Sequence, residues 1–152
     1  METDKDTILK KVLHYCAYQD RCLSEVRMKL STFELPDSEK RDILKLLQDE
    51  GFIDDERYVR TFVKSKFHLK KWGVKKIAMS LKMKGIDSDL IREALGEVDE
   101  DTYREALITL LKSKKINESD PFKRKAKLAQ YAMGKGYEAK LVWEVIALLF
   151  PR

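Results

Sequence analysis

The chain has 152 residues, of which 43% are hydrophobic and 38% are charged, and its formal net charge is +5. This length fits one domain or a short array of repeats, and the hydrophobic content is sufficient for ordered cores. No stretch approaches the roughly 20 apolar residues of a membrane span, and from the polar start of the chain we expect no signal peptide. We therefore expect a cytoplasmic protein whose basic balance favours an acidic partner.

Helical periodicity runs through most of the chain, which contains only six glycines and three prolines. Start and stop signals divide it into about nine short segments. We expect Ser24, Asp54 and Ser88 to be N-caps, and Pro121 to occupy the first turn of its helix. The expected helices cover residues 7–18, 24–35, 37–50, 54–71, 74–84, 88–98, 102–114, 120–134 and 138–150.

Apolar positions recur along the chain at an interval of 51 residues. Helix, tight turn and helix therefore appear three times, each preceded by a longer helix. We predict an all-α fold of three tandem three-helix repeats, 1–53, 54–99 and 100–152, in an elongated, curved array. Because each repeat is too small for a large core, neighbouring repeats should share apolar surface. The positions in phase are Val26, Ile77 and Leu128; Leu30, Leu81 and Ala132; and Leu35, Ile86 and Tyr137.

The most informative feature is the segment from Arg57 to Lys84, which contains ten Lys or Arg residues and no acid. We call this segment the basic block. Solvated helix faces normally mix their charges, because like charges three or four residues apart are destabilising. The pattern therefore favours a surface that binds a polyanion or an acidic protein, over a merely solvated face. On helical wheels the cations that point away from the apolar side, and that we expect to bind, are Arg57, Arg60, Lys64, Lys71, Lys75 and Lys82.

Three further features of the basic residues leave alternatives open. Trp72, at a helix junction, could stack on a base, although packing is the more common role of such a residue. Lys66 and Lys70 lie near the apolar arc, where their aliphatic stems could cover the core. A second, weaker acid-free stretch covers residues 121–137.

Catalytic chemistry is not indicated by this sequence. The two histidines, His14 and His68, belong to no recognisable acid–base or nucleophile signature. Cys16 and Cys22 are too few for a disulfide framework and lack the spacing of a zinc site, so we expect reduced thiols. We expect no enzyme activity, no cofactor and no metal.

The segment 51–59 reads GFIDDERYV, and it is followed by GVKKI at 73–77 and LKMKGI at 81–86. Together these residues resemble the signature of the RecX family, bacterial regulatory proteins of the RecA recombinase. SEVRMKL at 24–30, and KL at 127–128 with GKGY at 134–137, extend the similarity to nearly the whole chain. The departures affect local packing: Val59 stands where Ala is common, Tyr137 where Phe is common, and Ala132 where a larger residue is usual.

The resemblance implies the same three tandem repeats and a role in regulating DNA repair and recombination. It implies binding to RecA filaments on single-stranded DNA, in the helical groove and across neighbouring protomers, with weaker binding to naked DNA. Inhibition of the recombinase, ATPase and co-protease activities would follow, through blocked extension or promoted disassembly, and we expect a monomer. The signature itself has a structural interpretation: Gly51 and Gly85 end helices, Phe52 and Ile53 pack between modules, and Asp54 and Asp55 start a helix.

Two other functions fit the residues. One is a general nucleic-acid-binding module, for which residues 24–51 could pass as a helix-turn-helix unit. A recognition helix rich in Arg, Asn and Gln is missing there, which argues against sequence-specific reading. The other is a helical-repeat adaptor for an acidic protein.

Overall fold

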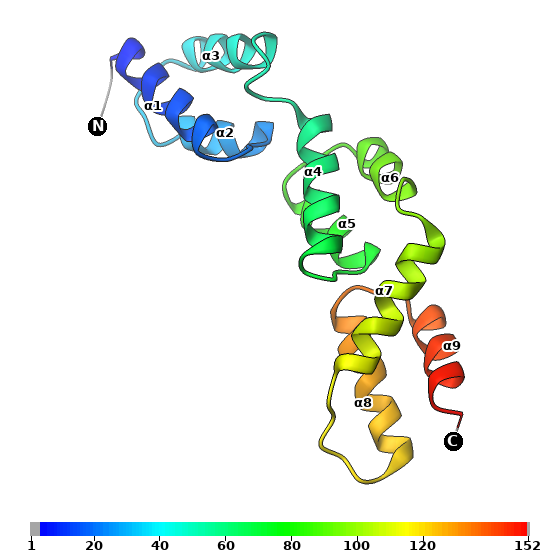
Figure 1. Cartoon of the computed structure of the whole chain (residues 1–152). Coiled ribbons are helices and arrows are strands. Elements are labelled where there is room, and N and C mark those ends of the chain that lie inside the picture. Colours follow the sequence, from blue (N-terminus) through cyan, green and yellow to red (C-terminus); the bar gives the residue numbers. More distant parts are fainter. Residues whose placement is uncertain (1–3, 152) are drawn as a thin grey trace.

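The computed structural model describes residues 4–151, and every regular element in that part of the chain is an α-helix. The helices form three successive groups along a bent, elongated body, with the two ends of the chain far apart (Figure 1). This confirms the predicted fold class. Module one contains α1 (Lys5–Tyr18), α2 (Leu23–Leu30) and α3 (Asp37–Asp49); module two contains α4 (Asp55–His68), α5 (Val74–Met83) and α6 (Ser88–Gly96); module three contains α7 (Glu100–Ser113), α8 (Pro121–Gly134) and α9 (Ala139–Leu149).

Most helices begin within two residues of the predicted start, and an acidic residue is the most common N-cap. The Asp54 carboxylate accepts a hydrogen bond from the Arg57 N–H at 3.1 Å, and Pro121 stands at the first position of α8. Two predicted caps were wrong by one or two residues. Asp87 caps α6 in place of Ser88, and Cys22 precedes α2 in place of Ser24. The Glu25 side chain fixes the start of α2, because it accepts the Cys22 N–H at 3.0 Å.

The repeated apolar positions form the cores. Val26, Ile77 and Leu128 are all buried, and so are Leu30, Leu81 and Ala132 at the next position in phase. The buried residues fall into two clusters: one lies within module one, and the other runs continuously through modules two and three and also takes in Cys22, the residue before α2 of module one. Apolar surface is therefore shared extensively between modules two and three, while module one keeps a core of its own.

Two glycines bring modules two and three into backbone contact. The Gly73 N–H donates to the Lys135 carbonyl at 2.7 Å, and the Lys75 N–H donates to the Gly136 carbonyl at 3.0 Å. A Cβ atom on Gly73 would lie only 2.3 Å from the Gly136 carbonyl carbon. Gly136 also has a φ of +103°, a conformation that favours glycine. This contact therefore requires glycine on both sides.

Tyrosines complete the joint between modules two and three. The Tyr103 hydroxyl accepts the Val74 N–H at 3.0 Å and donates to Glu138 Oε1 at 2.6 Å. The Tyr103 ring packs against Tyr137, with 5.0 Å between ring centroids. Burial, together with the Glu138 bond, raises the pKa of Tyr103, and burial raises that of Tyr137 to about 12. Both hydroxyls therefore stay protonated at neutral pH.

Candidate functional site

The basic block spans α4, the turn after it and α5, all in module two. Five of its six predicted binding cations have exposed side chains, which fits a solvent-facing role. The exception is Arg57, which is only partly exposed. The exposed five are Arg60, Lys64, Lys71, Lys75 and Lys82.

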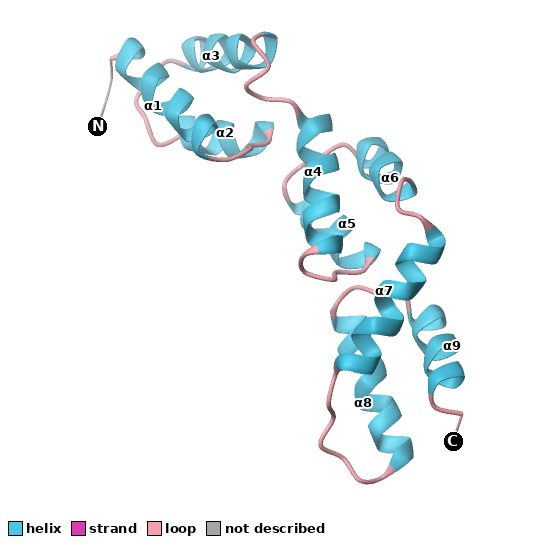
Figure 2. Ribbon diagram, in the orientation of Figure 1, coloured by secondary structure: helices cyan, strands magenta, loops and turns pink. Residues whose placement is uncertain are grey.

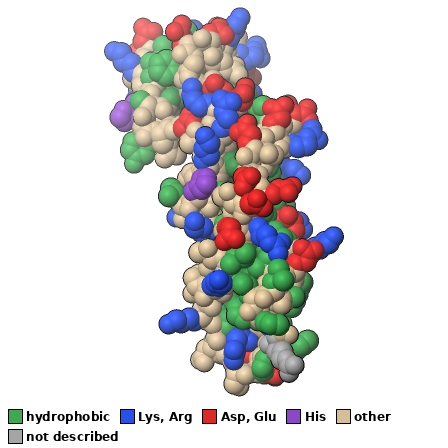
Figure 3. All heavy atoms as spheres, turned by 45° about the vertical axis from the view of Figure 1, so that its right-hand side comes forward, with side chains coloured by type: hydrophobic (Ala, Val, Ile, Leu, Met, Phe, Trp, Pro, Cys, Tyr) green, Lys and Arg blue, Asp and Glu red, His purple; other side chains and the backbone are tan. Residues whose placement is uncertain are grey.

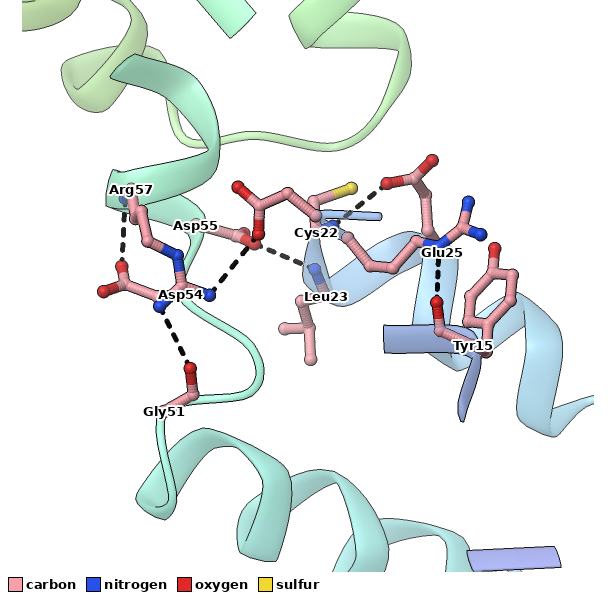
Figure 4. Close-up of polar contacts among 10 residues, drawn as sticks. Tyr15, Cys22, Leu23, Glu25, Gly51, Asp54, Asp55 and Arg57 are labelled. Carbon is pink, nitrogen blue, oxygen red and sulfur yellow. Dashed lines mark hydrogen bonds and ion pairs between the residues drawn. The ribbon is translucent and has the colours of Figure 1, made fainter. Parts of the chain in front are cut away.

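Arg57 connects module two to module one. Its terminal nitrogens donate to the Gly51 carbonyl at 3.0 Å and to Asp20 Oδ1 at 3.4 Å, and Figure 4 shows the bond to Gly51. The guanidinium thus joins the first turn of α4 to two segments of module one. Of the six predicted cations, Arg57 has the clearest structural role.

The residues around Arg57 that resemble the family signature, 51–59, mainly have structural roles. Asp55 reaches back to accept the Leu23 N–H at the start of α2, at 2.8 Å (Figure 4). Gly51 and Gly85 have positive φ values of 79° and 72° after their helices, as helix-ending glycines do. The prediction that Phe52 packs between modules was wrong: its side chain is 43% exposed, whereas the neighbouring Ile53 is buried. At this turn only one of two adjacent apolar residues faces the core.

The last cation of the block, Lys84, also faces module one. Its ammonium lies 3.3 Å from Glu25 Oε2, and its carbonyl accepts the Ser24 hydroxyl proton at 2.5 Å. Burial acts to lower the pKa of Lys84, but its interactions with Tyr58 and Glu25 outweigh that effect, so the pKa is raised. Burial acts to raise the pKa of Glu25, yet the Cys22 N–H and Lys84 hold it below its usual value. Both groups are therefore charged across the neutral range.

Two of the exposed cations share a cleft with acidic residues. Arg60 and Lys64 line a cleft of about 230 Å³ between α4 and the α6–α7 connection, and Glu97 and Asp99 line it as well. Arg60 also pairs with Glu56 at 3.0 Å. Acidic side chains accordingly appear among the basic ones over this part of the surface (Figure 3). The block is free of acids in sequence, but the fold places acids from other segments beside α4.

The exposed face of α5 is different. Lys75 and Lys82 lie two turns apart on it, and neither forms an ion pair within the described residues. Two exposed methionines share this helix, Met79 at 61% and Met83 at 82% exposure. A face of uncompensated lysines with flexible apolar side chains suits contact with an acidic macromolecule.

Trp72 packs against the core and lies between two lysines. Its ring centroid is 5.0 Å from Lys66 Nζ and 4.5 Å from Lys76 Nζ, and the Phe62 ring meets it edge-on at 6.5 Å. These contacts favour the packing role over base stacking. Lys66 also lies over the Phe62 ring, as expected for a lysine whose stem covers apolar surface.

The second acid-free stretch is partly neutralised by the preceding linker. Lys127 pairs with Glu118 at 3.1 Å, and Arg124 donates to the Glu118 carbonyl at 2.9 Å.

Within residues 4–151, no helix is long and apolar enough to cross a membrane, and no group of His, Cys, Asp and Glu is arranged to hold a metal. Cys16 and Cys22 are free thiols, and burial raises the pKa of each.

Comparison with protein families matches two family models to this chain. The second three-helix domain of RecX matches residues 54–95, and the third three-helix domain of RecX matches residues 100–146. These two matches cover more than half of the chain, including all of α4, α5 and α7. The basic block falls entirely within the first of them.

Curated relatives carry the description regulatory protein RecX. One from Clostridium botulinum (strain Eklund 17B / Type B) is 32% identical over 127 residues, covering 80% of this chain and 58% of the relative. One from Prosthecochloris aestuarii is 25% identical over 146 residues and covers 95% of both chains. This chain thus spans less than two thirds of the clostridial relative and nearly all of the second.

Solved structures share the fold. The crystal structure of RecX from Lactobacillus salivarius superposes with a TM-score of 0.85 at 23% identity, covering 97% of both chains. A second crystal structure, of a regulatory protein RecX, gives a TM-score of 0.83 at 24% identity, covering 93% of this chain and 70% of the other. The arrangement of three helical modules is therefore common to these proteins.

Proposed function

The chain belongs to the RecX family of regulatory proteins, and from that premise we propose that it regulates the RecA recombinase. It binds the filament that RecA forms on single-stranded DNA, and its elongated body lies in the helical groove. Bound there, it inhibits the recombinase, ATPase and co-protease activities by blocking filament extension or promoting disassembly. It acts by binding alone and performs no chemistry of its own.

The observation that carries this proposal is the exposed cationic surface at the middle of an elongated body. Lys64, Lys71, Lys75 and Lys82 are exposed and form no ion pair within the described residues. A filament on single-stranded DNA presents phosphates and protein surface along a continuous groove, which an array of three modules could follow. Module two, placed centrally, would make the main electrostatic contact.

The two joints fit this proposal in different ways. Modules two and three share one core, so they would dock as a single rigid piece. Module one is attached mainly through polar contacts and contributes only Cys22 to that core, so it could adjust its orientation to the curvature of the groove. Arg57 then has a positioning role, because it orients the modules and its guanidinium is already engaged.

The direct test measures ATP hydrolysis and strand exchange by RecA while this protein is added below the RecA concentration. We expect both rates to fall, because one inhibitor that stops extension or starts disassembly affects many protomers. Unchanged ATPase and strand exchange at saturating protein would contradict the proposal.

The alternative function is a general, non-sequence-specific nucleic-acid-binding module. The same exposed lysines favour it, since phosphates attract them whether or not RecA is present. The discriminating measurement is the affinity for the RecA–single-strand filament against that for the same strand bare, across salt concentrations. Tighter binding to the filament supports the regulator, whereas equal affinities with a steep salt dependence support the plain binder.

A further inference from the structure

Module one has a second cationic hollow, far from the basic block in the sequence. It is lined by α1, by Arg21 in the α1–α2 connection and by Lys29 in the last turn of α2, and its volume is about 460 Å³. Unlike the cleft beside α4, its lining contains no carboxylate. The side chains that give it its character are Lys10, Lys11, Arg21, Lys29, Tyr15 and Tyr18.

Arg21 is held in a fixed position at this hollow. Its guanidinium carbon lies 3.7 Å from the Tyr15 ring centroid, and its Nε donates to the Tyr15 carbonyl at 3.0 Å. Stacking and hydrogen bonding therefore use the ring-facing side and Nε, while the terminal nitrogens have no partner within residues 4–151. A pre-positioned guanidinium of this kind binds phosphate through two parallel hydrogen bonds at a small cost in side-chain entropy.

A lysine from α2 adds charge beside Arg21. The Lys29 ammonium lies 5.5 Å from the centroid of the same Tyr15 ring. Lys10 is exposed on α1 and lines the same hollow. Cations from two helices thus converge around one space, which is the arrangement that a phosphate requires and that a solvated helix face does not produce.

Tyr18 supplies an aromatic surface at the same hollow. Its side chain, at the last position of α1, is 76% exposed. Tyr15 already has Arg21 against its ring, so Tyr18 is the aromatic available to a ligand. An exposed aromatic ring beside several cations is the combination by which proteins hold single-stranded nucleic acid, because bases stack on the ring while phosphates meet the charges.

We propose that this hollow binds one nucleotide unit of single-stranded DNA. The terminal nitrogens of Arg21, with Lys10 and Lys29, hold a phosphate, and the adjoining base stacks on Tyr18. The volume lies in the range of small-ligand pockets. Paired bases of a duplex do not expose a face for stacking, so Tyr18 discriminates in favour of a single strand. The site needs no recombinase, and it goes beyond the regulatory function proposed above.

The test is fluorescence anisotropy of a short labelled oligothymidylate, and of a duplex of the same length, with the full chain and no RecA. Tyr18→Ala should weaken single-strand binding about fivefold or more, the lower limit for loss of one stacked base. Tyr18→Phe keeps the ring and should bind like the unchanged protein. Affinity for the duplex should be the same in all three proteins.

A charge reversal tests the phosphate contact. Lys10→Glu should weaken single-strand binding and reduce the slope of log affinity against log salt by about 0.7, as expected for one lost phosphate contact. The matched control is Arg41→Glu, an exposed charge reversal on α3 of the same module, which should leave that slope unchanged.

The proposal is overturned if Tyr18→Ala binds the single strand as tightly as the unchanged protein, or if Lys10→Glu and Arg41→Glu have equal effects. It is also overturned if polyglutamate displaces the oligonucleotide equally well from the unchanged protein and from Tyr18→Ala. Circular dichroism of each variant confirms that the helices are retained. RecA inhibition is measured separately, so failure here leaves the regulatory proposal intact, and the converse also holds.

Discussion

The contact between modules two and three differs in chemical character from the contact between modules one and two. Modules two and three meet through a shared apolar core, a glycine-to-glycine backbone contact and a buried tyrosine hydroxyl. Modules one and two are connected by a loop (Figure 2), by one buried side chain, Cys22, and by partly exposed polar contacts, chiefly Arg57 with Asp20 and Lys84 with Glu25. Close-packed backbone tolerates little change, whereas exposed ion pairs contribute little and are screened by salt.

The difference indicates a body with one rigid part and one adjustable part. Modules two and three should unfold together, because their buried residues form one cluster. Module one has its own core and is attached to the rest mainly by polar contacts that water and salt can replace, with Cys22 as its one residue in the shared cluster. Changes at the joint between modules two and three should therefore lower the free energy of unfolding. Changes at the joint between modules one and two should alter the orientation of module one.

The largest effect is expected from Gly136→Ala. The added Cβ would lie 2.5 Å from the Lys76 Cβ and 2.8 Å from the Gly73 carbonyl oxygen, and φ is unfavourable for alanine. We expect a loss of about 3 kcal/mol or more in the free energy of unfolding, measured by urea denaturation. Gly134→Ala is the control, because a Cβ there meets nothing within 4 Å. Equal stability of these two variants would show that the close contact does not matter.

A smaller loss is expected from Tyr103→Phe. The Val74 N–H and Glu138 would lose their partner, which costs about 1–3 kcal/mol for buried polar groups. Tyr137→Phe is the matched control in the same joint, because its buried hydroxyl has no hydrogen-bond partner within the described residues. That substitution should be neutral or stabilising. Thermal unfolding of both variants tests the difference, and the opposite ranking would contradict the assigned hydrogen bonds.

The two joints should also differ in their response to pH: alkali should weaken both, because Lys84 as well as Tyr103 and Tyr137 has a raised pKa, and acid should weaken the joint between modules one and two through Glu25. A raised pKa in the folded state means that Tyr103 and Tyr137 contribute fully below their ordinary pKa of about 10 and lose that contribution as pH rises beyond it. The cost is roughly 1 kcal/mol per pH unit for one tyrosine. Glu25 has a lowered pKa, so its contribution is present above the ordinary value near 4.5 and is lost as pH falls below it. Melting temperature against pH measures both, and the Tyr103→Phe variant should be less sensitive to alkali.

The smallest effect on stability is expected from Lys84→Ala combined with Arg57→Ala. Exposed or partly exposed pairs of this kind contribute about 1 kcal/mol or less each. Orientation should change more than stability, because these side chains hold module one against module two. Distances between labels on modules one and three, measured by energy transfer, should broaden in the variant and in high salt. If the variant showed the same distribution of label distances as the unchanged protein in low salt, the joint between modules one and two would be rigid without these side chains.

Much of this fold could be read from the sequence. The interval of 51 residues predicted that Val26, Ile77 and Leu128 occupy equivalent positions, and all three are buried. The cap at Asp54 and the first-turn position of Pro121 were equally predictable, because both depend on the local start of a helix. Such features depend on neighbours a few residues away.

What the sequence could not show depends on contacts between distant segments. Glu97 and Asp99 reach the cleft beside α4 only through the packing of α6 and α7, so the basic block looked more uniform than it is. Arg57 belonged to the six predicted binding cations by its spacing, but its hydrogen-bond partners lie 6 and 37 residues away. The hollow on module one was missed because Arg21 and Lys29 join Lys10 only when α2 folds against α1.

The central claim is that the exposed lysines of module two bind the RecA filament. The direct measurement is the affinity of the triple variant Lys64→Glu, Lys75→Glu and Lys82→Glu for RecA–single-strand filaments. The control carries the same charge change at exposed positions of module three and the linker after α7, as Lys112→Glu, Lys115→Glu and Lys140→Glu. We predict that the first variant loses at least about tenfold in affinity, about 1.4 kcal/mol, while the control keeps most of its binding. Equal affinities of the two variants would contradict the claim.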